Sequence, residues 1–289
     1  MADIYISVAN GNDTTGDGTI GTPLATIQKG LDDYMVAGDI MYIGNTTKTT
    51  LTTGLSMSLV GGTVDADNPL RFRPYDDGGA LSITMPGGNV DAWEVDGNDA
   101  VANIWNTTSL KNWVYIENAI YHGTTSYVVN AGTNWRFWQC EIYDGNATAL
   151  LDGATNCHYE SCIIRDSGGT GVDGIEGDGA GNYIHGCYIS GLTGVGVRAG
   201  NYNRIFDNVF GHCTEACIMA AVDHGIIRNN AFIGDGSASE IGIDFLSAAV
   251  ENIDIYIHQV TYLLRHTLKI RGNLTLFRNL SAWDNKFIP

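Results

Sequence analysis

Charge is scarce in this chain of 289 residues and is unequal in sign. Asp, Glu, Lys and Arg make up 16% of the residues, against about 25% in typical soluble proteins. The 15 basic residues are outnumbered by 32 acidic ones, so the net charge is −17. A partner rich in phosphate, such as nucleic acid, is therefore not expected. Because 44% of the chain is hydrophobic, a disordered acidic segment is also excluded.

Other features are missing as well. No run approaches the roughly 18 consecutive apolar residues of a membrane helix, so membrane insertion is not expected. The first residues show no basic region followed by an apolar one, so we expect no secretory signal. Six cysteines in 289 residues are too few for a disulfide scaffold. Glycine is abundant instead, with 37 residues, which indicates many turns.

An internal repeat occupies the middle of the chain. Each unit reads as an apolar residue, two variable residues, Asn or Cys, one variable residue and a second apolar residue. The spacings between central positions are 22, 22, 25, 21 and 22. All twelve flanking positions are apolar, which chance would rarely produce. The central positions are Asn118, Cys140, Cys162, Cys187, Asn208 and Asn230.

A period near 22 residues with the apolar spacing of strands predicts one coil of a β-solenoid per unit. Equivalent residues of successive coils then stack about 4.8 Å apart. We expect the six central residues to form an interior ladder, in which Asn amides bond to their neighbours and Cys is a small, buriable substitute. Cys213 and Cys217 are four residues apart, but no set with zinc spacing accompanies them.

The charge also divides the chain. Residues 1–250 carry 29 acidic and 10 basic residues, whereas residues 251–289 carry three acidic and five basic ones. We therefore predict an N-terminal cap at 1–44, a solenoid body at 45–250 and a C-terminal segment at 251–289. That last segment is interpreted as a cap, or as a tail for oligomerisation or docking, with short strands at 262–264 and 274–277.

The first forty residues contain a strand, a glycine-rich loop and an amphipathic segment. Pro23 suits a first helical turn, Leu24, Ile27 and Leu31 share one helical face, and Gly38 suits the helix end. These features, with the segment from Gly62 to Tyr75, resemble the pectate-lyase-like superfamily. The resemblance implies an all-β, right-handed parallel β-helix of about nine coils with an N-terminal capping helix.

The resemblance also implies polysaccharide lyases and hydrolases among the relatives. No lysine lies between Lys111 and Lys269 to serve as a lyase base. The sequence around Asp173 faintly resembles a polygalacturonase motif, but the Asp-Asp pair expected one coil later is missing. We therefore do not infer polygalacturonase activity.

One acidic column is a candidate catalytic site. The alternation of side chains along successive strands predicts that Asp152, Glu176 and Arg198 point outward, one rung apart. Neighbouring carboxylates raise one pKa, which a general acid requires. A solvated stripe in which Arg198 relieves carboxylate repulsion fits the same pattern, so both interpretations stay open.

Candidate ligands for a metal or a sugar are less specific. Asp13 and Asp17 lie in an oxygen-rich loop that could hold Ca²⁺, but the loop lacks the EF-hand order and such loops are commonly plain turns. We expect no cofactor. Exposed tryptophans could stack against sugars, and the candidates are Trp93, Trp105, Trp113, Trp135, Trp138 and Trp283. Trp135 and Trp138 flank a core position, so at least one of these two is expected to be packed in the core.

These observations favour a virion structural protein. We predict a homotrimeric capsid decoration (cement) or spike protein of a bacteriophage or virus, synthesised in the host cytoplasm, located on the virion surface and bound to the major capsid protein or another virion component. The alternative is an extracellular enzyme or tailspike depolymerase that cleaves host surface polysaccharide at Asp152, Glu176 and Arg198. A second alternative is a non-catalytic glycan-binding adhesion module.

Overall fold

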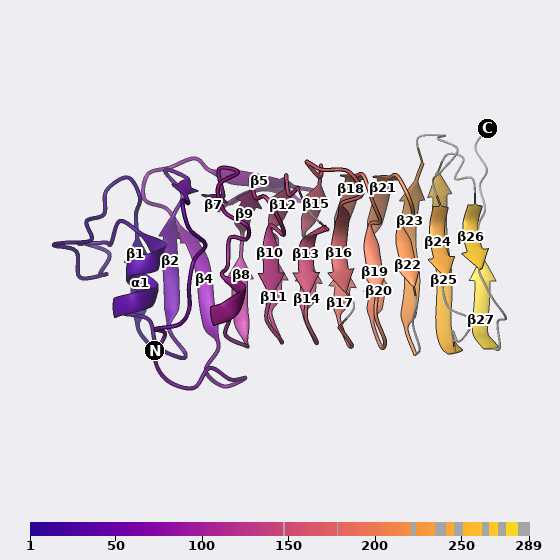
Figure 1. The fold of residues 1–289 in the computed structure, drawn as a ribbon, viewed down its shortest axis with the longest axis horizontal. Coiled ribbons are helices and arrows are strands. Elements are labelled where there is room, and N and C mark those ends of the chain that lie inside the picture. The colour runs from indigo at the N-terminus through magenta and orange to yellow at the C-terminus, as the bar shows by residue number, and fades with distance from the viewer. Residues whose placement is uncertain are drawn as a thin grey trace.

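The protein is an elongated stack of coils in this computed structural model, with residues 3–6 and residues 276–282 at opposite ends of the stack (Figure 1). The structure describes residues 1–146, 148–177, 179–220, 224–234, 241–245, 251–261, 266–270 and 276–282. From residue 245 onward it describes the backbone of strands alone. Among the described residues, no helix has the length and apolar character needed to cross a membrane.

The first sheet has 18 strands, and its described pairings are parallel. In each regular coil, a turn divides its contribution into two short strands. The strands are β1 Asp3–Ile6, β2 Ile40–Gly44, β3 Thr49–Thr50, β4 Leu70–Tyr75, β7 Trp93–Asp96, β8 Val114–Glu117, β9 Ala119–His122, β11 Arg136–Trp138, β12 Glu141–Tyr143, β14 His158–Glu160, β15 Ile163–Arg165, β17 Tyr183–His185, β18 Tyr188–Leu192, β20 Arg204–Phe206, β21 Val209–Cys213, β23 Ile226–Ile233, β25 Glu251–Thr261 and β27 Leu276–Ala282.

The second sheet closes the coil. Its strands are β10 Val129–Ala131, β13 Ala149–Gly153, β16 Asp173–Gly177, β19 Val197–Ala199, β22 Ile218–Ala220, β24 Ile241–Phe245 and β26 His266–Ile270. The predicted right-handed parallel β-helix is confirmed. The coil count differs slightly from the predicted nine, since the seven strands of this sheet span about six turns. The earlier chain forms less regular coils that contribute only to the first sheet.

The N-terminal helix is shorter than the sequence suggested. Helix α1 spans Ile27–Asp33, and the Thr26 side chain caps it by accepting a hydrogen bond from the Lys29 amide. Pro23 therefore precedes the helix, and Gly38, at φ 90°, follows it after a further turn. The buried side of α1 packs on β1 and β2, where a Cβ on Gly30 would lie 2.7 Å from Met41 Cε.

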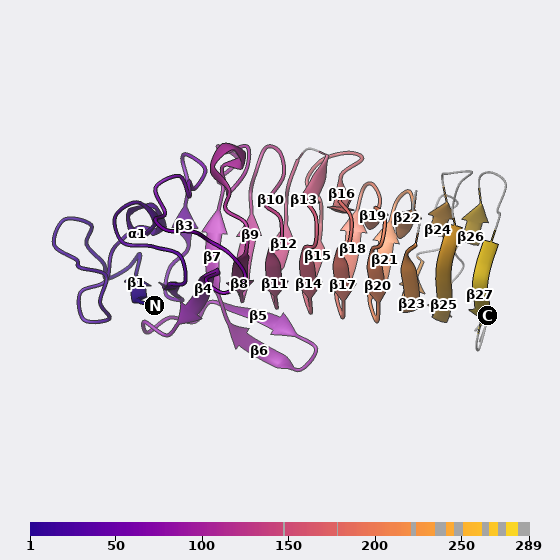
Figure 2. The same cartoon turned by 90° about the horizontal axis from the view of Figure 1, so that it is seen from below.

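Two small elements interrupt the coils. A 3-10 helix, η1, spans Thr107–Ser109. An antiparallel hairpin of β5 Ser82–Met85 and β6 Gly88–Asp91 projects from the body (Figure 2). The hairpin packs through Ile83 and Met85 on Ile120, outside the main core. A hairpin of this kind breaks the repeat, so no periodicity in the sequence indicated it.

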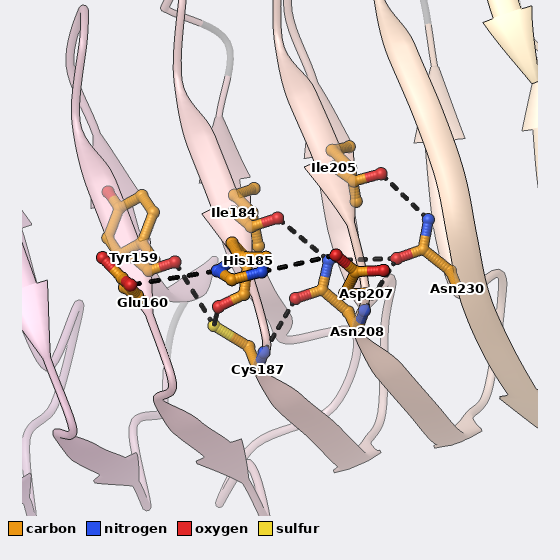
Figure 3. Close-up of polar contacts among 9 residues, drawn as sticks. All are labelled: Tyr159, Glu160, Ile184, His185, Cys187, Ile205, Asp207, Asn208 and Asn230. Carbon is orange, nitrogen blue, oxygen red and sulfur yellow. Dashed lines mark hydrogen bonds and ion pairs between the residues drawn. The ribbon is translucent and has the colours of Figure 1, made fainter.

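The predicted interior ladder is present from Cys140 to Asn230. The Asn208 Oδ1 atom accepts a hydrogen bond from the Cys187 amide at 2.8 Å. Its Nδ2 atom donates to the Ile184 carbonyl and to Asn230 Oδ1, both at 3.0 Å (Figure 3). Cys187 Sγ lies 3.5 Å from the Tyr159 carbonyl oxygen. All six cysteines are buried and lie outside any disulfide, as expected for thiols that pack.

In the coil before Cys140, the ladder position is one residue later than predicted. Ile120 pairs with Glu141, so Ala119 rather than Asn118 lies beside Cys140. Asn118 has φ 51° and occupies the turn position of Gln139, also at φ 51°. Its amide donates to the Asp91 carbonyl at 3.1 Å instead. The assignment of Asn118 to the ladder is therefore wrong.

The reason for this error is a local ambiguity. Tyr115 and Ile120 are apolar, so they satisfied the repeat pattern, yet the buried residues at the equivalent interior positions are Ile116 and Tyr121. A slip of one residue exchanges the two faces of a strand. The unit has apolar flanking residues whether Asn118 or Ala119 is taken as its central residue, and only the burial of these residues distinguishes the two alignments.

A second ladder was not anticipated. It lies at the start of β14, β17 and β20, where Asn182 Oδ1 accepts from the Cys157 amide at 2.8 Å. Asn203 Oδ1 accepts from the Asn182 amide at 2.9 Å. Both asparagines are buried, so the coil corner on the other side of these strands is also held by side-chain amides.

The coil continues beyond position 250. Strand β25 pairs with β23, β26 with β24, and β27 with β25, all parallel. The predicted strand at 262–264 lies outside the described residues, and the one at 274–277 is represented by the start of β27 at Leu276. The division into cap, body and tail stays a prediction, as does a docking role for the tail.

Candidate functional site

The second sheet brings the predicted column together. Asp152 of β13 pairs with Glu176 of β16, and Glu176 pairs with Arg198 of β19. Each of these side chains is half-buried, whereas their neighbours Leu151 and Ile175 are fully buried. The column therefore lies on the outer face of the sheet, and its successive residues are one rung, about 4.8 Å, apart.

Polar neighbours hold the two carboxylates of this column. Asn130 Nδ2 donates to Asp152 Oδ2 at 2.6 Å. The Tyr127 hydroxyl donates to Glu176 Oε2 at 3.2 Å. Burial and the two nearby carboxylates raise the pKa of Tyr127, so the phenol keeps its proton at neutral pH and acts as a donor. These contacts orient both carboxylates on a shared face.

Arg198 has a different principal partner from the one expected. Its Nε atom forms an ion pair with Asp173 of the preceding coil, and its Nη1 lies 3.1 Å from Met219 Sδ. The Asp173 side chain is only 1% exposed, and its Oδ1 accepts from the Val195 amide at 2.7 Å. Arg198 therefore compensates a buried charge, and Asp173 is enclosed rather than open to a substrate.

A sizeable cavity lies elsewhere, beneath the hairpin. It has a volume of about 730 Å³ and runs between β5 and the strands β12, β15, β18 and β21. Its polar lining includes Glu141, Arg165, Tyr188 and Asp207, and Met85 and Pro86 form its hairpin side. Arg165 Nη2 and Glu141 Oε1 are 2.7 Å apart, so these two charges already compensate each other.

A titratable cluster adjoins this cavity. His122 Nε2 lies 2.9 Å from Glu94 Oε1, and its ring stacks on Tyr143 with centroids 4.7 Å apart. Lys48 Nζ contacts Asp96 Oδ2 at 2.5 Å. Burial and, secondarily, the nearby Glu94 and Glu141 carboxylates raise the pKa of Tyr143 to about 12. The sequence did not indicate this cluster, because the register of β7, β9 and β12 brings its residues together.

The remaining candidates have structural contacts. Asp13 Oδ1 accepts from the Ala25 amide at 2.8 Å, and Asp17 Oδ1 accepts from the Thr19 amide at 3.1 Å. In the part of the chain that the structure describes, no three His, Cys, Asp or Glu residues gather as a metal site. Cys213 and Cys217, which are both buried, are therefore not part of such a group among the described residues.

The tryptophans divide into packed and exposed ones. Trp93, Trp105 and Trp135 are fully buried, so they stabilise the core and are not available to a sugar. Trp138 is 44% exposed. The prediction that at least one of Trp135 and Trp138 is packed is confirmed. Trp113 is half-buried, and Trp283 lies outside the described residues.

A family comparison agrees with the coil geometry. Residues 125–261 match the family described as "Right handed beta helix region", which places the match over the regular coils. No curated protein sequence is significantly similar to this chain.

Several solved structures share the fold at low sequence identity. The complex of XylC with xylose has a TM-score of 0.59 and 9% identity, over 93% of this chain and 70% of that chain. An alginate lyase from Paenibacillus sp. str. FPU-7 has a TM-score of 0.52 and 10% identity, over 94% and 99%. A structure named as a glycoside hydrolase has a TM-score of 0.52 and 9% identity, over 94% and 96%. The chain spans 56% of two other matching chains, so some neighbours are considerably longer.

Proposed function

We propose that this protein is a polysaccharide-cleaving β-helix enzyme and that Asp152 and Glu176 form its catalytic pair. The observation that carries the proposal is their register, which places two half-buried carboxylates on adjacent rungs of one outer face. The structural neighbours named as an alginate lyase and a glycoside hydrolase support this function. They share the fold at 9% and 10% identity, so the assignment rests on the site.

The chemistry follows from the spacing. Hydrolysis of a glycosidic bond uses one carboxyl group as an acid and the other as a nucleophile or base. Adjacent rungs are about 4.8 Å apart, close to the roughly 5–5.5 Å separation of retaining enzymes and below the roughly 6.5–9.5 Å of inverting ones. Two carboxylates at this distance do not ionise independently, because the first charge raises the pKa of the second group. We therefore propose hydrolysis with retention of anomeric configuration.

The test measures cleavage by single variants. Xylan, alginate and polygalacturonate serve as substrates, and new reducing ends are counted. Asp152→Asn and Glu176→Gln should each lower the rate by about a hundredfold or more, as loss of an acid or base does. Asp67→Asn, at an exposed position in an N-terminal loop, is the control with the same charge change. Cleavage that survives both substitutions, or products that absorb as unsaturated sugars, would refute this hydrolytic site.

The virion interpretation stays a prediction with less support than the enzyme proposal. Its trimer, its capsid partner and its surface location have no counterpart in the structural neighbours reported above. The adhesion module stays a prediction in the same way. The molecular mass of the protein in solution, measured together with cleavage, separates the enzyme from the virion protein. A monomer that cleaves polysaccharide contradicts a trimeric cement protein.

A further inference from the structure

The hairpin of β5 and β6 has an edge without a strand partner. Among the described residues, β5 pairs with β6 alone, and these two strands form a separate sheet (Figure 2). The register places Ser82 opposite Asp91 and Thr84 opposite Asn89. Each strand of such a pair directs one row of backbone N–H and C=O groups at its partner and a second row away from it.

The hydrogen-bond pattern identifies the groups that point outward from β5. The Ala92 amide donates to the Leu81 carbonyl at 3.0 Å, so these two residues form a hydrogen-bonded pair. Hydrogen-bonded and non-hydrogen-bonded pairs alternate along an antiparallel ladder, so Ser82 and Thr84 belong to non-hydrogen-bonded pairs. Their backbone N–H and C=O groups therefore lie along the outer edge of β5.

The outer edge of β6 is less open. Asn118 Nδ2 donates to the Asp91 carbonyl at 3.1 Å, so one outward group of β6 already has a partner. Asp91 also places a charge on that edge, and charges are one of the features by which natural edges avoid further pairing. Strand β5 contains no charged residue and no proline. A further strand would therefore add to β5 rather than to β6.

The edge of β5 is also held in a fixed position. The Leu81 amide donates to the Asn45 carbonyl at 3.1 Å at the start of the hairpin. Further along β5, the fully buried Ile83 packs on Ile120 of the body. A fixed edge lowers the entropic cost of binding, because the ligand does not have to order the hairpin.

The cavity beneath the hairpin lies along this edge. Ser82 and Thr84 belong to its lining, and its volume is about 730 Å³, within the roughly 300–1,000 Å³ of ligand sites in proteins. The body contributes an apolar strip to the lining, which consists of Ile163, Tyr188 and Val209. A strand added to β5 would therefore direct every second side chain into this cavity.

Negative charge exceeds positive charge around the cavity. Glu141 and Asp207 both belong to the lining. The lining also contains Arg165, whose guanidinium forms ion pairs with both Glu141 and Asp166. One positive charge is thus shared by two carboxylates, and Asp207 adds a third carboxylate. The cavity therefore favours basic side chains.

The strand register gives the spacing of these charges. Glu141 is aligned with Ile163, Ile163 with Tyr188, and Tyr188 with Val209. Asp207 lies two residues before Val209, so it is three rungs from Glu141. Three rungs of about 4.8 Å amount to about 14 Å. Two residues that are four positions apart on an extended strand are also about 14 Å apart, at about 3.4 Å per residue.

We propose that the β5 edge binds an extended peptide segment of a partner protein by strand addition. The segment has a basic residue, an apolar residue and a second basic residue at alternate positions. Its backbone pairs with Ser82 and Thr84, its basic side chains reach Glu141 and Asp207, and its apolar side chain packs on the strip between them. Backbone pairing supplies affinity in this mode of recognition, and the pockets for alternate side chains supply specificity.

A second copy of the chain fits this site less well. Two β5 edges can pair with each other, but β5 carries no basic side chain for the acidic cavity. The site is also independent of the proposed cleavage, because Asp152 and Glu176 lie on the second sheet. The Asp152→Asn/Glu176→Gln variant should therefore bind the peptide with unchanged affinity.

The experiment uses a heptapeptide that is blocked at both ends and has lysine at its second and sixth positions, isoleucine at its fourth and threonine elsewhere. Fluorescence anisotropy measures its affinity for the full chain. Thr84→Pro removes the outward N–H of the β5 edge and should weaken binding at least about tenfold. Asn89→Pro makes the same change at the residue directly opposite on β6 and should leave the affinity unchanged.

Modified peptides test the backbone and the charges separately. The N–H groups of adjacent residues in a strand point to opposite edges. Methylation of the backbone nitrogen at the fourth or at the fifth position should therefore abolish binding in one case only. Glutamine in place of both lysines should weaken binding about fivefold, as the loss of two partly exposed ion pairs does. Glu141→Gln/Asp207→Asn should remove this difference between the two peptides.

The proposal is wrong if the wild-type protein binds the heptapeptide with a dissociation constant above about 1 mM. Equal affinities of the Thr84→Pro and Asn89→Pro variants, at matched melting temperatures, would exclude the β5 edge. If Thr84→Pro does not fold, the methylated peptides decide, and equal affinities of these two peptides would exclude strand addition. Self-association that the heptapeptide competes away would assign the edge to a second copy of this chain instead.

Discussion

Replacement of Asn208 by alanine tests whether the interior ladder holds the coils together. In the native protein, Asn208 Oδ1 accepts from the Cys187 amide at 2.8 Å, and Asn208 Nδ2 donates to the Ile184 carbonyl at 3.0 Å. Asn208 is 1% exposed, so water cannot replace either partner. Alanine leaves one buried N–H and one buried carbonyl without a hydrogen bond.

The expected cost follows from these two groups. Each buried polar group without a partner costs about 1–3 kcal/mol, so the free energy of unfolding should fall by about 2–6 kcal/mol. Asn208→Cys is the matched comparison, because Cys187 already uses its Sγ at 3.5 Å from the Tyr159 carbonyl. A thiol can restore the bond to the Ile184 carbonyl, so this variant should lose about half as much.

The assay is urea denaturation followed by circular dichroism, combined with hydrogen exchange of the peptide that contains Cys187. Faster exchange of that amide in Asn208→Ala shows the lost bond directly, even where unfolding has more than two states. An unfolding free energy within about 0.5 kcal/mol of the wild type, the usual range of a neutral surface substitution, would refute the reasoning. So would an Asn208→Cys variant less stable than Asn208→Ala.

Three further predictions concern charged groups. Because the pKa of Tyr143 is raised from 10.0 to about 12, its phenol stabilises the fold below pH 10 and that contribution is lost between pH 10 and about 12. Tyr143→Phe should therefore flatten the alkaline fall of the melting temperature in this range, and a parallel curve would contradict the shift. Arg198→Ala leaves the buried Asp173 carboxylate unpaired and should cost about 3–5 kcal/mol; Asp173→Asn in the same chain should recover part of it, as measured by urea denaturation. Removal of Ca²⁺ with a chelator should leave the melting temperature unchanged, because the Asp13 and Asp17 carboxylates already accept hydrogen bonds within their loop; a drop would restore the calcium interpretation.

The candidate site illustrates what pattern alone can predict. Alternation along the strands and the length of each coil were enough to place Asp152, Glu176 and Arg198 in one column, because a parallel register repeats the same face at every rung. The principal partner of Arg198 was not predictable in this way. The ion pair with Asp173 joins two residues of different coils, and the sequence pattern does not reveal which of two nearby carboxylates a flexible side chain reaches.

The sequence by itself determined the solenoid, its period near 22 residues and the buried Cys and Asn ladder, because these depend on local patterns that each coil repeats. The tertiary structure decided the frame of the first unit, where Asn118 lies in the turn and Ala119 in the core. It also decided where charge matters. Composition reports a chain of −17, but only the stacking of distant rungs gathers Arg71, Arg136 and Arg204 on one face. Electrostatic attraction depends on the arrangement of charges in space, and in this fold residues one coil apart in sequence become near neighbours on the same face.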